Sequence, residues 1–184
     1  MTVFFTADTH FGHGGALGLF MRPFPSVAAM DEAMVRGWNE RVGDTDEVWH
    51  LGDVAMGRTV SLLPDLLREL RGRKHLVAGN NDGPATRGLS AWSSVQDYAE
   101  LTLADRFLVL CHYPLRAWNR QHRGALQLHG HSHGRLAPLP RQVDVGVDVW
   151  NFAPVALDEL LERSVQRSRS RVNSSSGRRT PRSA

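Results

Sequence analysis

The sequence predicts an α/β protein with one largely parallel sheet followed by a second sheet. Residues 1–78 alternate short apolar runs with helical patterns, in the order β-α-β-α-β. This alternation favours parallel strands with helices packed against them. Between residues 95 and 147, short apolar or alternating runs follow one another, which indicates a second sheet. The chain has 184 residues, 41% of them hydrophobic, and is long enough to bury a core of this size.

Three short runs near the start have the pattern of strands, and the first of them has that of a buried strand. They are residues 3–7, 47–51 and 74–78. Two amphipathic patterns between them predict helices, over 27–41 and over about 60–70. Ser26 is a suitable N-cap for the first helix, and Pro64 falls in the first turn of the second. The segment from Phe11 to Pro25 is rich in glycine and proline and is expected to be a loop.

The second half of the chain carries shorter strand patterns. Residues 106–111, which are apolar after Arg106, lead into His112, and residues 125–129 lead into a Gly-His turn. Residues 142–147 alternate in the manner of a half-buried strand. A terminal helix is expected from residue 157 to about residue 165.

The charges divide the chain into two parts. Residues 1–162 hold all 19 acidic residues and 15 of the 22 basic ones, whereas residues 163–184 hold seven arginines and no acid. We expect the first part to form the folded domain and the second a disordered tail, because the tail has few apolar side chains to bury. The tail is either a solubilising extension or a contact for nucleic acid or another polyanion.

Several classes of protein are excluded by composition. No apolar run approaches the roughly 20 residues of a membrane span. The residues Met1–Phe5 lack the basic region of a signal peptide. The single cysteine, Cys111, excludes an internal disulfide framework. We therefore expect a cytoplasmic protein without a membrane partner.

Polar residues follow five of the predicted strands at the point where each strand ends. They are Asp8 and His10, Asp53, Asn80, His112, and His131 and His133. The carboxyl ends of strands are where an α/β sheet presents its ligands, so we expect these side chains to share one crevice. Residues two apart in extended backbone point to the same face, so Asp8 and His10 can grip one ion, as can the two histidines of the last block. Seven oxygen and nitrogen donors without thiolate suit two divalent metals such as Mn, Fe, Zn or Co.

The ordered series D-x-H, G-D, G-N, H and G-H-x-H, which runs from Asp8 to His133, resembles the calcineurin-like metallophosphoesterase superfamily. Four further stretches resemble a small bacterial and phage branch of predicted phosphoesterases: residues 9–13, 22–24, 112–115 and 144–148. The resemblance implies a two-sheet β-sandwich flanked by helices, in the four-layer order α/β/β/α. It also implies a hydrolase that acts on phosphate esters, as a phosphodiesterase or phosphatase.

The resemblance assigns roles by position. It implies two groups of metal ligands and a bridging carboxylate: Asp8, His10 and His133 on the first metal, Asn80, His112 and His131 on the second, and Asp53 between them. A hydroxide shared by the metals then attacks phosphorus in line with the leaving alkoxide. In this reaction Asp53, Asn80 and His112 are expected to be catalytic. Manganese is the expected metal, with iron, zinc, cobalt or nickel as alternatives.

The third block departs from the superfamily pattern. The superfamily usually has Gly-Asn-His followed by Asp or Glu, with the histidine associated with the leaving group, whereas residues 79–82 read Gly-Asn-Asn-Asp. Asn81 cannot deliver a proton at neutral pH. Either leaving groups of low basicity are favoured, which favours phosphodiesters over alkyl monoesters, or His13 or another nearby histidine takes over.

The expected partner is a small phosphate ester, with nucleotides as one option. Asn80, Asn81 and Arg22 are expected to bind it, since a guanidinium suits phosphate, although an ordinary exposed arginine is the alternative for Arg22. Asp148 either orients a ligand histidine or caps a strand end. Two other functions stay open: a catalytically silent metal-binding interaction module of the same fold, and nucleic-acid binding through the tail.

Overall fold

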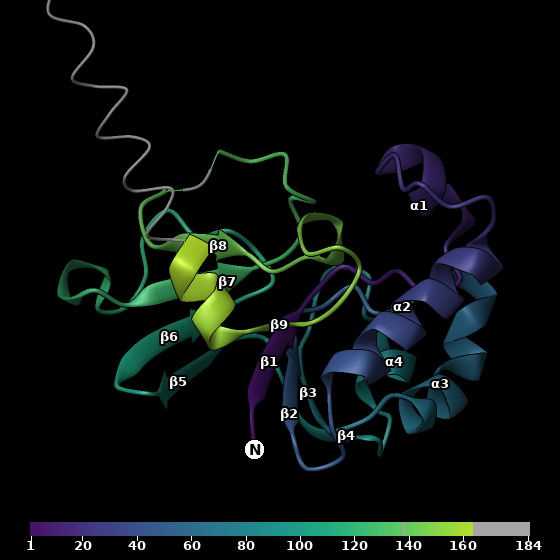
Figure 1. The fold of residues 1–184 in the computed structure, drawn as a ribbon, viewed down its shortest axis with the longest axis horizontal. Coiled ribbons are helices and arrows are strands. Elements are labelled where there is room, and N and C mark those ends of the chain that lie inside the picture. The colour runs from purple at the N-terminus through teal and green to yellow at the C-terminus, as the bar shows by residue number, and fades with distance from the viewer. Residues whose placement is uncertain (138, 164–184) are drawn as a thin grey trace, which may run out of the picture.

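The computed structural model of the chain describes residues 1–137 and 139–163. Two β-sheets lie next to each other, and helices cover the outer side of the first sheet (Figure 1). The predicted architecture of two sheets flanked by helices is therefore confirmed. The tail predicted over residues 163–184 lies outside the described residues except for Arg163. No helix in the described ranges is long and apolar enough to cross a membrane.

The first sheet has the strand order β4-β3-β2-β1-β9. Its strands are β1 (Val3–Thr6), β2 (Glu47–His50), β3 (Arg73–Val77), β4 (Trp92–Gln96) and β9 (Val155–Ala156). The strands β1 to β4 run parallel to one another, and β9 pairs antiparallel with β1. A connection that contains at least one helix joins each of these parallel strands to the next, which is the usual form of such a crossover.

The second sheet has the order β5-β6-β7-β8. Its strands are β5 (Ala99–Leu103), β6 (Arg106–Leu110), β7 (Leu126–His129) and β8 (Gln142–Asp144). A hairpin joins β5 to β6, and β6, β7 and β8 are parallel. Loops with the single 3₁₀ turns η2 (Gln121–Arg123) and η3 (Val147–Val149) flank these strands.

The two predicted N-terminal helices are both present. The helix α2 (Val27–Arg41) has the predicted bounds, and the Ser26 hydroxyl accepts a hydrogen bond from the Ala29 N–H at 3.1 Å. The second forms in two parts, the 3₁₀ helix η1 (Gly57–Leu62) and α3 (Leu63–Glu69), with Pro64 in the first turn of α3. The predicted terminal helix begins at residue 157 and continues to residue 163, where the described part ends.

Several short elements are absent from the sequence-based prediction, among them two helices and a two-residue strand. The helix α1 (Gly14–Leu19) lies within the expected loop, and its six residues include three glycines. Such a sequence has low helical propensity, so α1 depends on tertiary contacts, among them those of the buried Ala16. The other helix is α4 (Pro84–Arg87) and the strand is β9; they are four and two residues long, which is too short to produce a periodic signal.

The first sheet is buried on both faces. One apolar core lies between this sheet and its helices and contains Phe4 together with Met34 and Trp38 of α2. The other lies between the two sheets and contains Phe5 of β1 and Leu108 of β6. Strand β1 therefore reads as a continuous apolar run rather than an alternating one, as expected for a parallel strand covered on both sides.

The parallel strands bring their carboxyl ends to one edge of the molecule. The Asp8 N–H donates to the Gly52 carbonyl at 2.9 Å, which joins the ends of β1 and β2. A bridge between Ala7 and Gly146 ties the first sheet to the loop after β8. The polar residues that follow the strands of both sheets consequently meet at a shared edge.

Candidate metal centre

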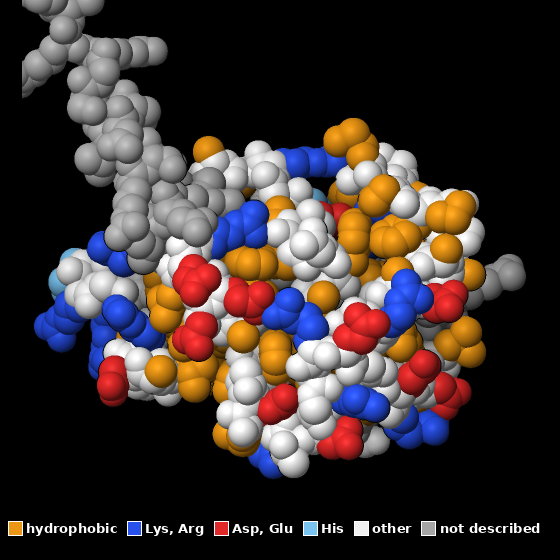
Figure 2. Space-filling view, viewed as in Figure 1, with side chains coloured by type: hydrophobic (Ala, Val, Ile, Leu, Met, Phe, Trp, Pro, Cys, Tyr) orange, Lys and Arg blue, Asp and Glu red, His pale blue; other side chains and the backbone are white. Residues whose placement is uncertain are grey.

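A cluster of carboxylates and imidazoles occupies the edge where the two sheets meet. In Figure 2, histidine and acidic atoms are visible at the bottom of a recess near the top of the view. Two groups of side chains at this edge could each hold a metal ion. Within each group, the potential ligand atoms all lie within 4.8 Å of one another. Both groups include Asp8, which is fully buried.

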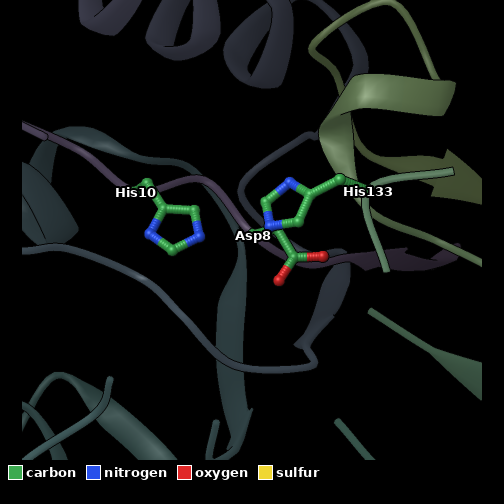
Figure 3. A group of neighbouring side chains, drawn as sticks. All are labelled: Asp8, His10 and His133. Atoms are coloured by element: carbon green, nitrogen blue, oxygen red, sulfur yellow. The ribbon is translucent and has the colours of Figure 1, made fainter. Parts of the chain in front are cut away.

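The first group combines Asp8 and His10 with His133. Figure 3 shows Asp8 and His10 coming from one N-terminal segment and His133 approaching from a separate loop. The His10 and His133 rings lie 5.3 Å apart and nearly parallel. The Phe20 ring stacks on His133 with a centroid separation of 3.5 Å. The first predicted set of ligands is therefore brought together.

The second group combines Asp8 and Asp53 with His112. The Asn80 Oδ1 atom lies 3.1 Å from His112 Nε2. The His131 ring is 5.1 Å from the His112 ring, and its backbone N–H donates to the Asp8 carboxylate at 2.9 Å. The remaining predicted ligands thus lie beside one another. Asp8 belongs to both groups, whereas the resemblance assigned it to the first metal alone.

Asp53 stands between the two groups. Its Oδ2 atom is 3.6 Å from His10 Nε2, and its Oδ1 atom is 3.7 Å from His112 Nε2. The side chain is almost fully buried, so it is shielded from water. One oxygen faces each group, which is the placement needed for a bridging carboxylate.

The donor atoms at this edge fit divalent cations. Both ring nitrogens of His10 are buried and have no hydrogen-bond partner among the described residues. His112 bonds the Leu51 carbonyl through Nδ1 at 2.7 Å, and His133 bonds Asp148 through Nδ1 at 2.7 Å. Each of these rings therefore keeps Nε2 as the remaining ligand atom, as is usual for metal-binding histidines. Unpaired buried imidazole and buried carboxylate together are costly unless a cation satisfies them.

The ionisation of the cluster also favours a cation. Burial, followed by the nearby carboxylate of Asp144, raises the pKa of Asp8 well above its usual value. Burial, followed by His133 and Arg22, lowers the pKa of His10 to about 3. Burial, followed by His112, lowers the pKa of His131. A bound cation reverses the penalty on the carboxylate and requires the imidazoles in their neutral form.

The backbone adopts a sparsely populated conformation at five of the seven predicted ligands. Their φ angles lie between 48° and 65°, in the left-handed region: Asp8, His10, Asp53, His131 and His133. Each such residue costs of the order of 1–3 kcal/mol, and residues of this kind cluster at functional sites. Gly79 allows the loops to approach closely, because a Cβ there would lie 2.4 Å from Asp53 Oδ1.

Two aspartates that the sequence analysis did not include hold the ligand loops. Asp82 accepts three backbone N–H groups, from Asp53, Val54 and Gly79, at 2.7 to 3.0 Å. Asp144 accepts the Ser132 hydroxyl and the N–H groups of Gly134 and Gly146 at 2.7 to 2.9 Å. Asp82 lies in the third block of the superfamily pattern, and Asp144 lies in one of the further stretches that resemble the phosphoesterase branch. These positions were the only feature of the sequence that could have indicated a role for them.

The predicted substrate-binding residues differ in their surroundings. The Asn81 side chain donates to Asp53 Oδ2 at 2.6 Å, and Asn80 is exposed beside His112. Arg22 is 4% exposed, and its guanidinium is bonded inside the protein. It is therefore not the ordinary exposed arginine that the sequence left as an alternative. The His13 ring lies 5.5 Å from His10.

The two sheets share an edge lined by carboxylates, imidazoles and an amide, and this donor set suits divalent cations. The family model described as "Calcineurin-like phosphoesterase superfamily domain" matches residues 1–151, and the chain belongs to this superfamily. The family implies divalent metal ions and phosphate-ester substrates, and the described residues offer two groups of ligands for such ions. The resemblance identified in the sequence is thereby confirmed.

Relatives of the chain occur in phages and archaea. The Gene 66 protein of Mycobacterium phage D29 is 31% identical over 191 residues, which cover 87% of this chain and 94% of the phage protein. An uncharacterized protein of Methanocaldococcus jannaschii is 26% identical over 168 residues, which cover 87% of this chain and 89% of the archaeal one. A protein of unknown function from Aquifex aeolicus has a similar structure, with a TM-score of 0.70 and 19% identity, covering 88% of this chain and 98% of that one. At that identity the likeness supports the fold alone.

Proposed function

We propose that the protein hydrolyses small phosphodiesters, nucleotide diesters among them, at a dinuclear metal centre that holds manganese. In this proposal the first ligand group, which we call the enclosed group (Asp8, His10 and His133), holds one cation. The group around His112 holds the other, and Asp53 bridges them. Two divalent cations, when bound, lower the pKa of a shared water and neutralise charge on the phosphate. The cytoplasmic location expected from the sequence is part of the same proposal.

One observation supports the dinuclear arrangement above the others. The two carboxylate oxygens of Asp53 face different histidines, His10 at 3.6 Å and His112 at 3.7 Å. A carboxylate that served a single metal would not need imidazoles on both sides. The separate ligand groups on its two flanks give the same indication.

The chain's own residues hold the predicted metal ligands in position. Asp82 holds the loops that carry Asp53 and Gly79, and the Leu51 carbonyl fixes the ring of His112. The exposed Asn80 amide stands beside His112, where it can contact a phosphate oxygen. These fixed groups need no reorganisation during the reaction, which is the main source of electrostatic catalysis.

The preference for diesters rests on Asn81. Its amide N–H points to Asp53 Oδ2 at 2.6 Å, and its backbone N–H donates to Asp53 Oδ1 at 2.9 Å. The amide is therefore engaged with the bridging carboxylate, and an amide cannot protonate a leaving alkoxide at neutral pH. Substrates whose leaving group needs no proton are expected to react fastest.

The proposal is tested with purified protein, bis-p-nitrophenyl phosphate and added Mn²⁺, with p-nitrophenyl phosphate and an alkyl monoester measured in parallel. We expect turnover of the diester that stops when a chelator is added and returns with Mn²⁺, and slower turnover of the alkyl monoester. Metal content is determined on the same samples.

Two results would contradict parts of the proposal. Full metal loading without hydrolysis of any ester would instead support the catalytically silent interaction module. Faster turnover of p-nitrophenyl phosphate than of bis-p-nitrophenyl phosphate, which releases the same leaving group, would overturn the preference for diesters while leaving the metal centre intact.

A further inference from the structure

Arg22 is a buried charge at the back of the metal centre. Its side chain has no exposed surface, although it comes from the segment between α1 and α2. The rings of Phe20 and Phe152 flank it, with centroids 5.4 and 5.9 Å from the guanidinium carbon. A charge buried in this way is stable only when its hydrogen bonds are satisfied.

All five guanidinium N–H groups have acceptors within the protein. Nε and Nη2 hold the Asp148 carboxylate in a bidentate pair at 2.8 and 2.9 Å. Nη1 donates to the Thr9 carbonyl at 2.8 Å and contacts the Met30 sulfur at 3.5 Å. Nη2 also donates to the Asp8 carbonyl at 2.6 Å. No N–H group is left over for a substrate phosphate.

These acceptors connect Arg22 to every ligand of the first group. The Asp8 and Thr9 carbonyls belong to the turn that carries Asp8 and His10, both of which have left-handed backbone. Asp148 in turn accepts a hydrogen bond from His133 Nδ1 at 2.7 Å. One side chain thus holds the strained turn on one side and, through Asp148, the third ligand on the other.

We propose that Arg22 is the positioning residue of the enclosed metal site, which holds Asp8 and His10 through their backbone and fixes His133 through Asp148. This inference rests on the metal-binding part of the proposed function. It replaces the expectation that Arg22 touches the substrate. It also assigns Asp148 as the residue that keeps the proton of His133 on Nδ1 and leaves Nε2 for the cation.

The geometry requires arginine rather than another cation. A planar guanidinium presents donors in a fork that matches a carboxylate on one edge and two carbonyls on the other. A lysine has three donors on a single nitrogen and cannot reach both edges. Arg22→Lys is therefore expected to keep the charge and lose the alignment.

The test compares Arg22→Lys, Arg22→Met and Asp148→Asn with the wild-type chain. Arg41→Met is the matched control, because Arg41 forms an ion pair with Glu159 that also joins distant segments but lies outside the metal centre. Mn²⁺ affinity and stoichiometry are measured by titration calorimetry. The tautomer of His133 is read from ¹⁵N NMR of the metal-free protein.

We expect each Arg22 and Asp148 variant to weaken one of the Mn²⁺ sites by about 10- to 100-fold, the usual effect of losing an outer partner of a ligand. In the same variants His133 should lose its fixed Nδ1–H tautomer. Arg41→Met should lower the melting temperature and leave both readouts unchanged. The double variant of Arg22 and Asp148 should be no weaker than the weaker single variant, because both act through one chain of contacts.

Wild-type Mn²⁺ affinity and an unchanged His133 tautomer in Arg22→Lys would overturn the inference. Equal losses in Arg22→Lys and Arg41→Met would also overturn it, since the effect would then be one of general stability. If Arg22→Met fails to fold, Arg22→Lys and Asp148→Asn still decide the question. Failure of the proposed function can be distinguished from failure of this inference. If the wild-type chain binds Mn²⁺ without turnover, the Mn²⁺ affinities and the His133 tautomer can still be compared among the variants.

Discussion

The two halves of the metal centre are built differently. The enclosed half, made of Asp8, His10 and His133, is backed by the buried Arg22 and covered by the Phe20 ring. In the open half, the predicted ligands Asn80 and His131 are exposed. The ring of Tyr113, which is 44% exposed, lies next to His131. In the proposed dinuclear centre, we therefore expect the enclosed half to retain its cation and the open half to admit the substrate.

Asp53 joins the halves, so its removal should have the largest effect. In Asp53→Asn we expect turnover of bis-p-nitrophenyl phosphate to fall by at least about 10²-fold, because the amide carries no charge to share between two cations. The measurement is kcat/KM with metal content on the same sample. Asp97→Asn is the control, because Asp97 is an exposed aspartate paired with Arg87. Two retained metals and full activity in Asp53→Asn would contradict the bridge.

Removing one imidazole at a time, first from one half and then from the other, should show whether the two halves hold their ions differently. His10→Ala is expected to reduce the bound metal from about two to about one equivalent and to leave an easily exchanged ion. His131→Ala should also lose about one equivalent but keep the slowly exchanging ion of the enclosed half. The measurement is metal content after dialysis against a chelator for increasing times. Identical exchange in both variants would show that enclosure does not distinguish the halves.

Restoring a histidine at the third block tests the open half. Asn81→His is expected to raise the rate on an alkyl ester by up to about tenfold, below the 10²–10⁴-fold of an evolved general acid, because the position lies against Asp53. The rate on bis-p-nitrophenyl phosphate should change little, since that leaving group needs no proton. Asn81→Ala serves as the control for loss of the amide. An unchanged alkyl rate in Asn81→His would show that protonation is supplied elsewhere.

The last prediction concerns Asp8→Asn in the metal-free protein, where the expected change is one of stability and is the smallest of this series. Burial and Asp144 raise the pKa of Asp8 in the folded state, so its contribution to stability is complete below the unfolded pKa and is lost as the pH rises through the folded pKa. At neutral pH the ionised carboxylate therefore destabilises the metal-free protein. The metal-free variant should melt a few °C higher than wild type at about pH 7 and no higher near pH 4.

The control for this prediction is the metal-loaded protein. With Mn²⁺ present the order should reverse, because wild type gains binding energy that Asp8→Asn cannot gain. Thermal unfolding with and without chelator at both pH values gives all four comparisons. A lower melting temperature for the metal-free variant at neutral pH would mean that the hydrogen bonds from His131 to Asp8 outweigh the burial of its charge.

Much of the fold follows from local patterns. The helix at 27–41 was predicted with its observed bounds because its cap, its apolar spacing and its stop all agree. The helix α1 and the two-residue strand β9 were not predicted, since each depends on contacts with distant segments rather than on its own sequence. The ligand blocks were found because each follows a strand, and parallel strands end at the same edge.

The sequence by itself determined the alternation of the first strands and helices, the presence of two sheets and the residue types that suit divalent cations. It could not separate a buried arginine from an exposed one, so Arg22 was expected at the substrate. Only the tertiary structure shows that Arg22 is buried, because the hydrogen-bond partners that surround it lie 13, 14 and 126 positions away along the chain. Burial and hydrogen bonding between such distant residues depend on how the sheets meet, which no local pattern encodes.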